Sequence, residues 1–357
     1  MKDSRHVHVI GTGTIGEPLI GLLADYRKEL GIETVSFHKR TPLPSERAKV
    51  RSLMDRGALL CTDDPAMAKF EEQGLKVSWD AEESIDRAAV VIDCTPSGIG
   101  HENKQKYYDR FTHNTAGFVA QGSEFGFGKM YARGINDEAL NADDKFIHVV
   151  SCNTHNISVL LKTLAITDNN PDNLVEAKFV MMRRSSDTSQ DGDFLPAPKV
   201  GKHEDSRFGT HHARDAWHIF QTLGYDLNVF SSAIKLNTQY MHCLWFNIRV
   251  KEKIDLPTVM SRLTENRRIA TTEKTSANQI YSFGRDHGHY GRILSQTVVP
   301  TKTIAVNNDH EIIGFAFTPQ DGNPLLSSVA IASWYIDSDQ GLEKRLDCLK
   351  PYLFHEI

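Results

Sequence analysis

The sequence predicts an α/β protein of two domains, in which a parallel sheet with crossover helices precedes an α+β half with a mainly antiparallel sheet. Three observations support this class. The chain has 357 residues, more than one hydrophobic core usually serves. Short apolar runs alternate with helical patterns over the first 150 residues. From about residue 175, runs such as AKFVMMRR and QYMHCLWFNIRV suggest strands that face a core on one side only.

The elements of the first half follow in order along the chain. Residues 7–10 form a first strand, and residues 17–29 form an amphipathic helix that tolerates Pro18 in its first turn. The later strands are short, apolar and followed by turn residues, and they cover 34–38, 88–94, 117–121 and 146–151.

The second half begins with a helix over residues 157–166. Residues 185–205 are rich in polar and turn-forming residues and contain two prolines, so we expect a long surface loop there. No internal repeat or low-complexity tract is present in the sequence.

Composition and charge restrict the class of partner and the compartment. The net charge is −5 and no basic run is present, so nucleic acid is not expected as a partner. Local basic groups can still bind small anions. Five widely spaced cysteines favour a reducing compartment over a disulfide framework. No stretch approaches 18 apolar residues, and the N-terminus lacks the apolar region of a secretory signal. We therefore expect a cytoplasmic protein without a membrane partner.

A glycine-rich motif connects the first strand to the first helix. It is GTGTIG, and its candidate cofactor-binding residues are Gly11, Gly13, Thr14, Ile15 and Gly16. In this setting the first glycine permits a tight turn, the second lets the backbone approach a diphosphate, and the third allows close helix packing. The N–H groups at the start of the helix then face the diphosphate charge. The motif predicts a Rossmann dinucleotide-binding domain.

The end of the second strand indicates which dinucleotide is bound. NAD-preferring sites usually carry an acidic residue there, whereas this chain has Lys39 and Arg40. Two cations favour the 2′-phosphate of NADP, with NAD as a further possibility, and a solvated basic loop is the alternative. The cofactor-binding set also includes Thr95 and Pro96, which follow the predicted strand at 88–94. It further includes Gln121 and Gly122, at the end of the predicted strand at 117–121.

Cys152 lies where an apolar strand ends and a helix follows. A thiol at a helix N-terminus is stabilised as a thiolate, which can attack an aldehyde and give a hemithioacetal and then a thioester. A buried structural cysteine is the alternative. His242 interrupts an apolar strand and suits a general base, although a hydrogen-bonded core histidine would look the same.

Several polar and basic groups are suited to phosphate. Arg183 and Arg184 end a strand, and His211 and His212 form a tandem pair beside Arg214. Surface charge is the alternative for each cluster. The tandem histidines lack a Cys or His ligand set at metal-binding spacing, so we predict no metal.

These motifs together resemble the archaeal-type, or type II, phosphorylating glyceraldehyde-3-phosphate dehydrogenases, and the resemblance runs along most of the chain. Cys152 within VVSCNT is the specific match. Further matching stretches are GTGTIG (11–16), HKR (38–40), CTPSGIGHEN (94–103), MRRSSD (182–187), the HH pair with Asp215, MH (241–242) and SFGRD (282–286).

The resemblance implies roles for the matched residues. Cys152 would be the nucleophile and His242 the base. The substrate and phosphate set would be Ser151, Asn153, Thr154, Arg183, Arg184, His211 and His212. The family fold implies a Rossmann domain over 1–151, completed by a C-terminal helix at 331–357, a catalytic domain over 152–330, and a homotetramer.

Departures from the family pattern concentrate near the expected substrate. They are His155-Asn156 after SCNT, Ala213-Arg214 after HH, 300–303 (PTKT), and the 318–330 segment. The leading hypothesis is that the protein catalyses NADP-dependent oxidation of glyceraldehyde 3-phosphate with inorganic phosphate. The alternatives are a related dehydrogenase of another phosphoaldehyde or semialdehyde, and a non-catalytic NADP-binding sensor.

Overall fold

The computed structural model describes residues 5–187, 192, 194–319, 321–338 and 341–357, which form two compact units. Unit 1 comprises Met1–Lys129, Leu140–Val149 and Leu325–Cys348. Unit 2 comprises Met130–Ala139, Val150–Pro324 and Leu349–Ile357. The sequence-based boundaries at 151 and 330 differ from this division mainly because residues 130–139 and 349–357 belong to unit 2.

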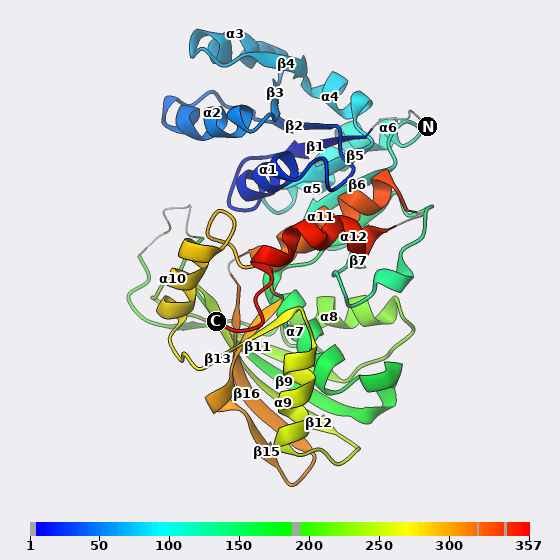
Figure 1. Cartoon of the computed structure of the whole chain (residues 1–357), viewed down its shortest axis with the longest axis vertical. Helices are drawn as coiled ribbons and strands as arrows, with labels where there is room; N and C mark the ends of the chain where they lie inside the picture. The colour runs from blue at the N-terminus through cyan, green and yellow to red at the C-terminus, as the bar shows by residue number, and fades with distance from the viewer. Residues whose placement is uncertain (1–4, 188–191, 193, 320, 339–340) are drawn as a thin grey trace. The chain divides into compact units, whose positions relative to one another are not determined.

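Unit 1 is built on a sheet that has eight strands among the described residues, in the order β4-β3-β2-β1-β5-β6-β8-β7 (Figure 1). Each pairing from β4 to β8 is parallel. The strands are β1 His6–Ile10, β2 Thr34–His38, β3 Leu59–Thr62, β4 Val77–Asp80, β5 Val90–Asp93, β6 Gly117–Gln121, β7 Lys129–Tyr131 and β8 Phe146–Val149. The strand order reverses between β1 and β5, and this topology confirms the predicted Rossmann fold.

Short helices connect these strands. They are α1 Gly16–Asp25, α2 Arg47–Asp55, α3 Asp64–Glu72, α4 Ala81–Arg87, α5 Ile99–Asn103 and α6 Asp109–Phe111, with a 3₁₀ turn, η1, at Pro44–Glu46 and a π turn, η2, at Lys104–Tyr108. The first helix is shorter than the predicted 17–29 range. Its backbone leaves helical geometry at Tyr26, and the chain then turns through Gly31 at a φ of 76° to reach β2.

The C-terminal helix starts earlier and ends earlier than the predicted 331–357 segment. The long helix is α11 Gly322–Ile336, followed by α12 Leu342–Leu346 and the 3₁₀ segment η7 Asp347–Tyr352. Within unit 1, the ring of Tyr335 lies where a Cβ atom at position 117 would be, so only glycine at this position leaves room for the ring. The Tyr335 hydroxyl donates to the carbonyl oxygen of Asp144 at 2.5 Å. These contacts attach α11 to the β6 region of unit 1.

Unit 2 contains a second sheet with the order β10-β11-β9-β12-β16-β14-β13, and β15 pairs with β16. Its strands are β9 Leu174–Arg183, β10 Lys199–Val200, β11 Val229–Lys235, β12 His242–Val250, β13 Ile269–Thr272, β14 Thr297–Pro300, β15 Ala305–Asn307 and β16 Glu311–Thr318. Among the described strands of this second sheet, only the β9–β11 and β13–β14 pairs are parallel. The predicted mainly antiparallel sheet is therefore confirmed.

The helices of unit 2 are α7 Cys152–Leu164, α8 His211–Gln221, α9 Leu256–Glu265 and α10 Ala277–His287. Helix α7 begins five residues before the predicted start at 157, because Ser151 caps it: the Ser151 side chain accepts a hydrogen bond from the Thr154 N–H. Leu160 and Leu164 of α7 are fully buried in one core cluster with Phe179 and Phe246 of the sheet.

The predicted loop at 185–205 is largely without regular structure where it is described, except for the short strand β10 at its end. Residues 188–191 and 193 of that prediction lie outside the described residues. Within the described part of the chain, no helix combines the length and apolarity needed to cross a membrane.

Candidate active site

The glycine-rich loop between β1 and α1 has two crowded glycines and one open glycine. A Cβ atom at Gly16 would lie 2.1 Å from the carbonyl oxygen of Gly11, and one at Gly11 would lie 3.0 Å from that of Cys94. A Cβ at Gly13 would meet no atom of the described residues within 4 Å. Thr14 and Ile15 complete the turn before α1 begins. The crowded glycines shape the turn, and the open one leaves the room that a dinucleotide diphosphate requires.

The other predicted cofactor residues follow β5 and β6, at the same carboxyl edge of the parallel sheet. Thr95 is held by Asp93, whose carboxylate accepts from the Thr95 backbone N–H at 2.9 Å and from its hydroxyl. Pro96 is exposed beside it, and Gln121 is buried. Gly122 has a φ of 81°, and a Cβ there would meet no described atom within 4 Å. The sheet therefore brings these residues to the edge that carries the glycine loop.

The two cations predicted for a 2′-phosphate have different surroundings. Lys39 and Arg40 directly follow β2. The Lys39 ammonium lies 3.2 Å from the Glu46 carboxylate, whereas Arg40 is exposed to solvent. Lys39 is therefore already paired with an internal carboxylate.

Cys152 is the first residue of α7 and is half-buried. Its backbone carbonyl accepts a hydrogen bond of 2.9 Å from the Asn323 side chain. Burial first and the Asp321 carboxylate second raise the pKa of the Cys152 thiol to about 12, against the opposing charge of Arg184. The helix N-terminus thus does not produce a resting thiolate in this structure, contrary to what helix position alone favours.

His242 begins β12 and is held by the strand beside it. The backbone N–H of Arg184 donates to His242 Nδ1 at 3.0 Å. Because Nδ1 is the acceptor, the proton of the neutral ring resides on Nε2. Burial and the positive charges of Arg184 and Arg183 lower the pKa of His242 well below its ordinary value. His242 is therefore arranged to donate from Nε2, and acting as a base there would first require the ring to release Arg184.

A hydrogen-bonded network connects the residue after Cys152 to β16 and α8. Asn153 accepts from the Thr318 hydroxyl at 3.0 Å, and its amide lies 3.3 Å from His212 Nε2. Thr318 also accepts from the Asn156 amide at 2.9 Å. Thr318 is the register partner of His242 in the β12–β16 pair. The network therefore fixes the start of α7 next to the strand that carries His242.

Arg183 is the last residue of β9 and Arg184 follows it, and the two side chains differ in exposure. Arg184 is 5 % exposed, and its two terminal nitrogens contact protein groups: Nη1 donates to the Tyr240 carbonyl at 3.1 Å, and Nη2 donates to Asp187 at 2.8 Å and lies 3.5 Å from Asp321. Arg183 is exposed. Since both guanidinium groups act on the pKa of Cys152 and of His242, they lie near both. Arg183 is the one of the pair that remains accessible to an anion.

The tandem histidines begin α8. The His211 and His212 rings stack at 4.0 Å, and the positive charge of Arg183 acts on both. His211 is half-buried, 3.8 Å from Glu204, and burial lowers its pKa. Burial lowers the pKa of His212 well below the ordinary value, so both rings are neutral hydrogen-bonding groups near neutral pH.

The remaining predicted substrate residues, Ser151 and Thr154, serve the cap of α7. Their hydroxyls lie 3.0 Å apart, and His155 Nδ1 lies 3.0 Å from the Ser151 carbonyl oxygen. His155 and Asn156, the departure after SCNT, are both fully buried, so their side chains act in the frame of the site.

Sequence reasoning missed three residues of this site: Thr318, Asp321 and Asn323. Thr318 is the last residue of β16, Asn323 is the second residue of α11, and Asp321 lies between the two elements, where burial raises the pKa of its carboxyl. Asp321 also has a φ of 51°, uncommon for a residue with a side chain. The polar run TPQDGN between an apolar strand and an apolar helix was the available signal.

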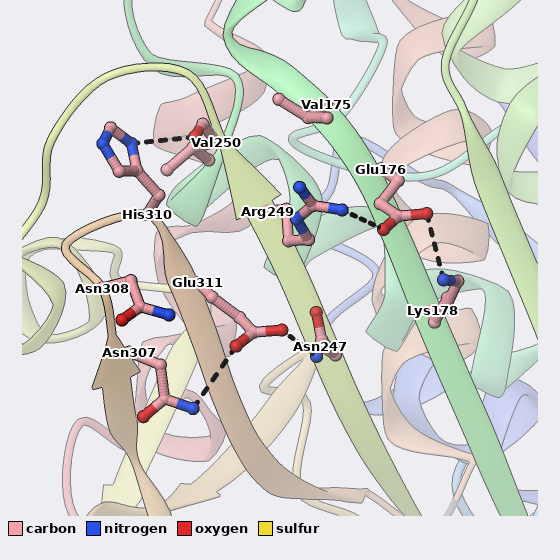
Figure 2. Close-up of a pocket in the computed structure, with 10 residues that line it drawn as sticks. All are labelled: Val175, Glu176, Lys178, Asn247, Arg249, Val250, Asn307, Asn308, His310 and Glu311. Atoms are coloured by element: carbon pink, nitrogen blue, oxygen red, sulfur yellow. Dashed lines mark hydrogen bonds and ion pairs between the residues drawn. The ribbon is translucent and has the colours of Figure 1, made fainter.

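A separate hollow of about 530 Å³ lies on the second sheet and shares no residue with the site around Cys152 (Figure 2). Its charged groups pair with one another. Arg249 donates to Glu176 at 2.6 Å, Lys178 lies 3.1 Å from Glu176, and Asn247 donates to Glu311 at 2.7 Å. The hollow thus offers little unpaired chemistry. Among the described residues, no cluster of His, Cys, Asp or Glu could hold a metal ion.

Comparisons with known proteins identify relatives along most of the chain, although no protein-family model matches it. The chain is 25 % identical to a glyceraldehyde-3-phosphate dehydrogenase of Sulfolobus acidocaldarius, over 85 % of this chain and 84 % of that protein. It is 27 % identical to the enzyme of that name from Methanobacterium formicicum, over 74 % and 73 % of the two chains. The corresponding protein of Saccharolobus solfataricus is 24 % identical, over 98 % of this chain and 99 % of its own.

These relatives and the geometry lead to the same conclusion. The Rossmann fold, the glycine loop and relatives named as dehydrogenases together imply a nicotinamide dinucleotide cofactor. The resemblance inferred from the motifs is confirmed by proteins that match over most of both chains. The chain is thus related, over most of its length, to the archaeal-type glyceraldehyde-3-phosphate dehydrogenases.

Proposed function

We propose that this chain oxidises glyceraldehyde 3-phosphate with NADP and inorganic phosphate to 1,3-bisphosphoglycerate through Cys152. The observation that carries the proposal is the arrangement in unit 2. A half-buried thiol begins a helix, a neutral histidine is held in one tautomer, and an exposed arginine acts electrostatically on both. The names of the archaeal relatives supply the substrate.

The first step forms a bond between the Cys152 sulfur and the aldehyde carbon. The thiol must lose its proton first. A bound anionic substrate near Arg183 does not assist this loss, because its charge offsets the positive charge that favours the thiolate. We therefore propose solvent as the proton acceptor. The carbonyl oxygen then becomes an oxyanion of the hemithioacetal. We assign the stabilisation of this oxygen to the Nε2–H of His242, whose Nδ1 is held by Arg184.

The second and third steps convert this adduct to product. The bound dinucleotide would accept the hydride from the former aldehyde carbon, which leaves a thioester on Cys152. A phosphate oxygen then attacks the thioester carbonyl carbon, the carbon–sulfur bond breaks, and the thiolate is regenerated. We assign the phosphate groups to Arg183, His211 and the polar groups at the start of α7, because Arg184 is buried and its terminal nitrogens already contact protein groups.

The decisive experiment follows reduced cofactor by its absorbance, with glyceraldehyde 3-phosphate, in the presence and absence of phosphate. We expect phosphate-dependent turnover in the wild type, none in Cys152→Ser, and normal turnover in Cys348→Ser. Cys348 is a suitable control because it is another half-buried free thiol, in unit 1.

Two other functions make different predictions in the same assay. Turnover with another aldehyde but not with glyceraldehyde 3-phosphate would assign a related dehydrogenase. This alternative draws support from the departures at His155-Asn156 and Ala213-Arg214. Cofactor binding without turnover of any aldehyde would assign a non-catalytic NADP-binding sensor.

The assembly and compartment are part of the proposal. We propose a homotetramer in the cytoplasm, in keeping with the family that the chain resembles and with its five free cysteines. Light scattering coupled to gel filtration tests the assembly directly. A mass of one chain, 40.1 kDa, would contradict it.

A further inference from the structure

A carboxylate lies between two ammonium groups beside the predicted position of the cofactor 2′-phosphate. Glu46 is 3.2 Å from the Lys39 ammonium and 2.9 Å from the Lys49 ammonium. The hydrogen bonds from Lys49 and Lys39 lower the pKa of Glu46 although burial opposes them, so Glu46 is ionised near neutral pH. A second carboxylate, Glu17, lies 3.7 Å from Lys49.

The backbone of unit 1 holds this cluster at the glycine loop. The Lys39 N–H donates to the Cys61 carbonyl at 3.0 Å, and the Lys39 carbonyl accepts from the Thr62 hydroxyl at 2.8 Å. The end of β2 is therefore fixed by β3. On the other side, the Lys49 ammonium lies 3.4 Å from the carbonyl oxygen of Thr12, within GTGTIG. Lys49 thus connects the glycine loop to the Glu46 carboxylate, which also contacts Lys39.

The positions of Glu46 and Lys49 follow from their element. Glu46 ends the 3₁₀ turn at Pro44–Glu46, and Lys49 lies three residues later in the first turn of α2. Residues three apart on a helix share a face, so both side chains point to the same place. The Lys39 side chain is 13 % exposed and that of Lys49 is 23 % exposed, so solvent screens the cluster only in part.

We propose that Glu46 is an internal competitor for the 2′-phosphate of NADP, and that Lys49 is a third cation of that subsite. The inference rests on the proposed NADP cofactor and concerns what sets its preference over NAD. A 2′-phosphate is a dianion or nearly so, and it needs the same ammonium groups that Glu46 occupies. NADP therefore has to displace Glu46 from Lys39 and Lys49, whereas NAD, which carries a hydroxyl there, does not.

The experiment measures binding of NADP⁺ and NAD⁺ by calorimetry to the whole chain, without aldehyde. We expect Glu46→Gln to bind NADP⁺ about tenfold or more tightly than the wild type does, with NAD⁺ affinity unchanged within about twofold. Lys49→Met should weaken NADP⁺ binding by about tenfold and leave NAD⁺ binding unchanged. The gain in Glu46→Gln should shrink as the salt concentration rises.

A charge-matched control separates this local effect from net charge. Glu33→Gln removes the same charge from an exposed position in unit 1, and it should change neither affinity. Thermal unfolding followed by circular dichroism establishes that each variant is folded. If Glu46→Gln binds NADP⁺ no better than the wild type does, or binds it less tightly, Glu46 orders the lysines for the phosphate and the competitor role is wrong.

The outcome for the proposed cofactor is read separately, from the wild type alone. A wild type that prefers NAD⁺ would refute the proposed NADP preference. The competitor role would still stand if Glu46→Gln then gained NADP⁺ affinity. Unchanged NADP⁺ binding in Lys49→Met would remove Lys49 from the subsite whichever cofactor the wild type prefers.

Discussion

At the scale of single residues, the site combines a protonated thiol with a neutral histidine. Burial raises the pKa of Cys152 to about 12, and burial with two guanidinium groups lowers that of His242 well below its ordinary value. Both shifts favour the uncharged form, so a thiolate–imidazolium pair is not the resting state of this structure. Activation of the thiol therefore has to accompany ligand binding or a rise in pH.

The raised thiol pKa predicts how Cys152 reacts with iodoacetamide. Because only a small fraction is thiolate at neutral pH, the alkylation rate should rise about tenfold for each pH unit between about 7 and 9. Mass spectrometry of the Cys152 peptide measures this rate, and Cys152→Ser gives the background from other cysteines. A plateau already reached at neutral pH would mean that the thiolate forms in the free protein.

The tautomer of His242 predicts a difference between two substitutions. Gln places an N–H donor at a similar reach but cannot take up a proton, whereas Ala removes both functions. We expect His242→Ala to lower kcat by about 10²-fold or more, and His242→Gln to retain a clearly larger share. Equal losses in the two variants, measured with the same aldehyde, would favour the base role expected from sequence over the donor role.

At the scale of elements, the start of α7 decides where the thiol lies. The apolar periodicity predicted a helix only from residue 157, because 152–156 (CNTHN) contains little apolar signal. The polar side chains in this stretch instead bond to the Ser151 hydroxyl and to β16. Ser151 as a capping residue was readable from sequence, but the pairing of Asn153 and Asn156 with Thr318 joins residues that are 165 and 162 positions apart, and periodicity does not report such contacts.

The capping bond predicts the stability of this element. Ser151→Ala should lower the free energy of unfolding by about 1 kcal/mol, because the Thr154 N–H loses its acceptor. Urea denaturation followed by circular dichroism measures the change. Ser276→Ala is the matched control, since Ser276 precedes α10 at the same position but makes no capping hydrogen bond with its side chain. Losses of equal size would show that the cap bond of α7 contributes little.

At the scale of the whole molecule, the sequence was most informative where structure is local. The strands at 34–38 and 117–121 have the bounds predicted for them, because each is a short apolar run that ends in turn residues. Residues 130–139 and 349–357 fall in unit 2, whereas the predicted boundaries place them with the Rossmann domain. Glu46 was missed because its meaning depends on Lys39 and Lys49, which are joined only by folding.

The discontinuous units predict the behaviour of a truncated chain. Residues 1–324 keep the glycine loop but lose Leu325–Cys348, which unit 1 uses to support its sheet through Ser328 on Gln121 and Tyr335 over Gly117. We expect this fragment to bind no dinucleotide by calorimetry and to unfold at lower temperature than the full chain. Tight binding by the fragment would mean that the β1–α1 loop folds without the C-terminal helix.

The late position of α11 in the chain has a consequence for biosynthesis. A domain generally folds as its residues emerge from the ribosome, and N-terminal domains usually fold first. Here the parallel sheet is synthesised early. The packing of Tyr335 on Gly117 and the hydrogen bond between Gln121 and Ser328 can form only when translation is nearly complete. The nascent sheet therefore lacks its contacts with α11 during most of synthesis. Until α11 is made, the incomplete domain avoids aggregation only if aggregation is slow or if a chaperone binds it.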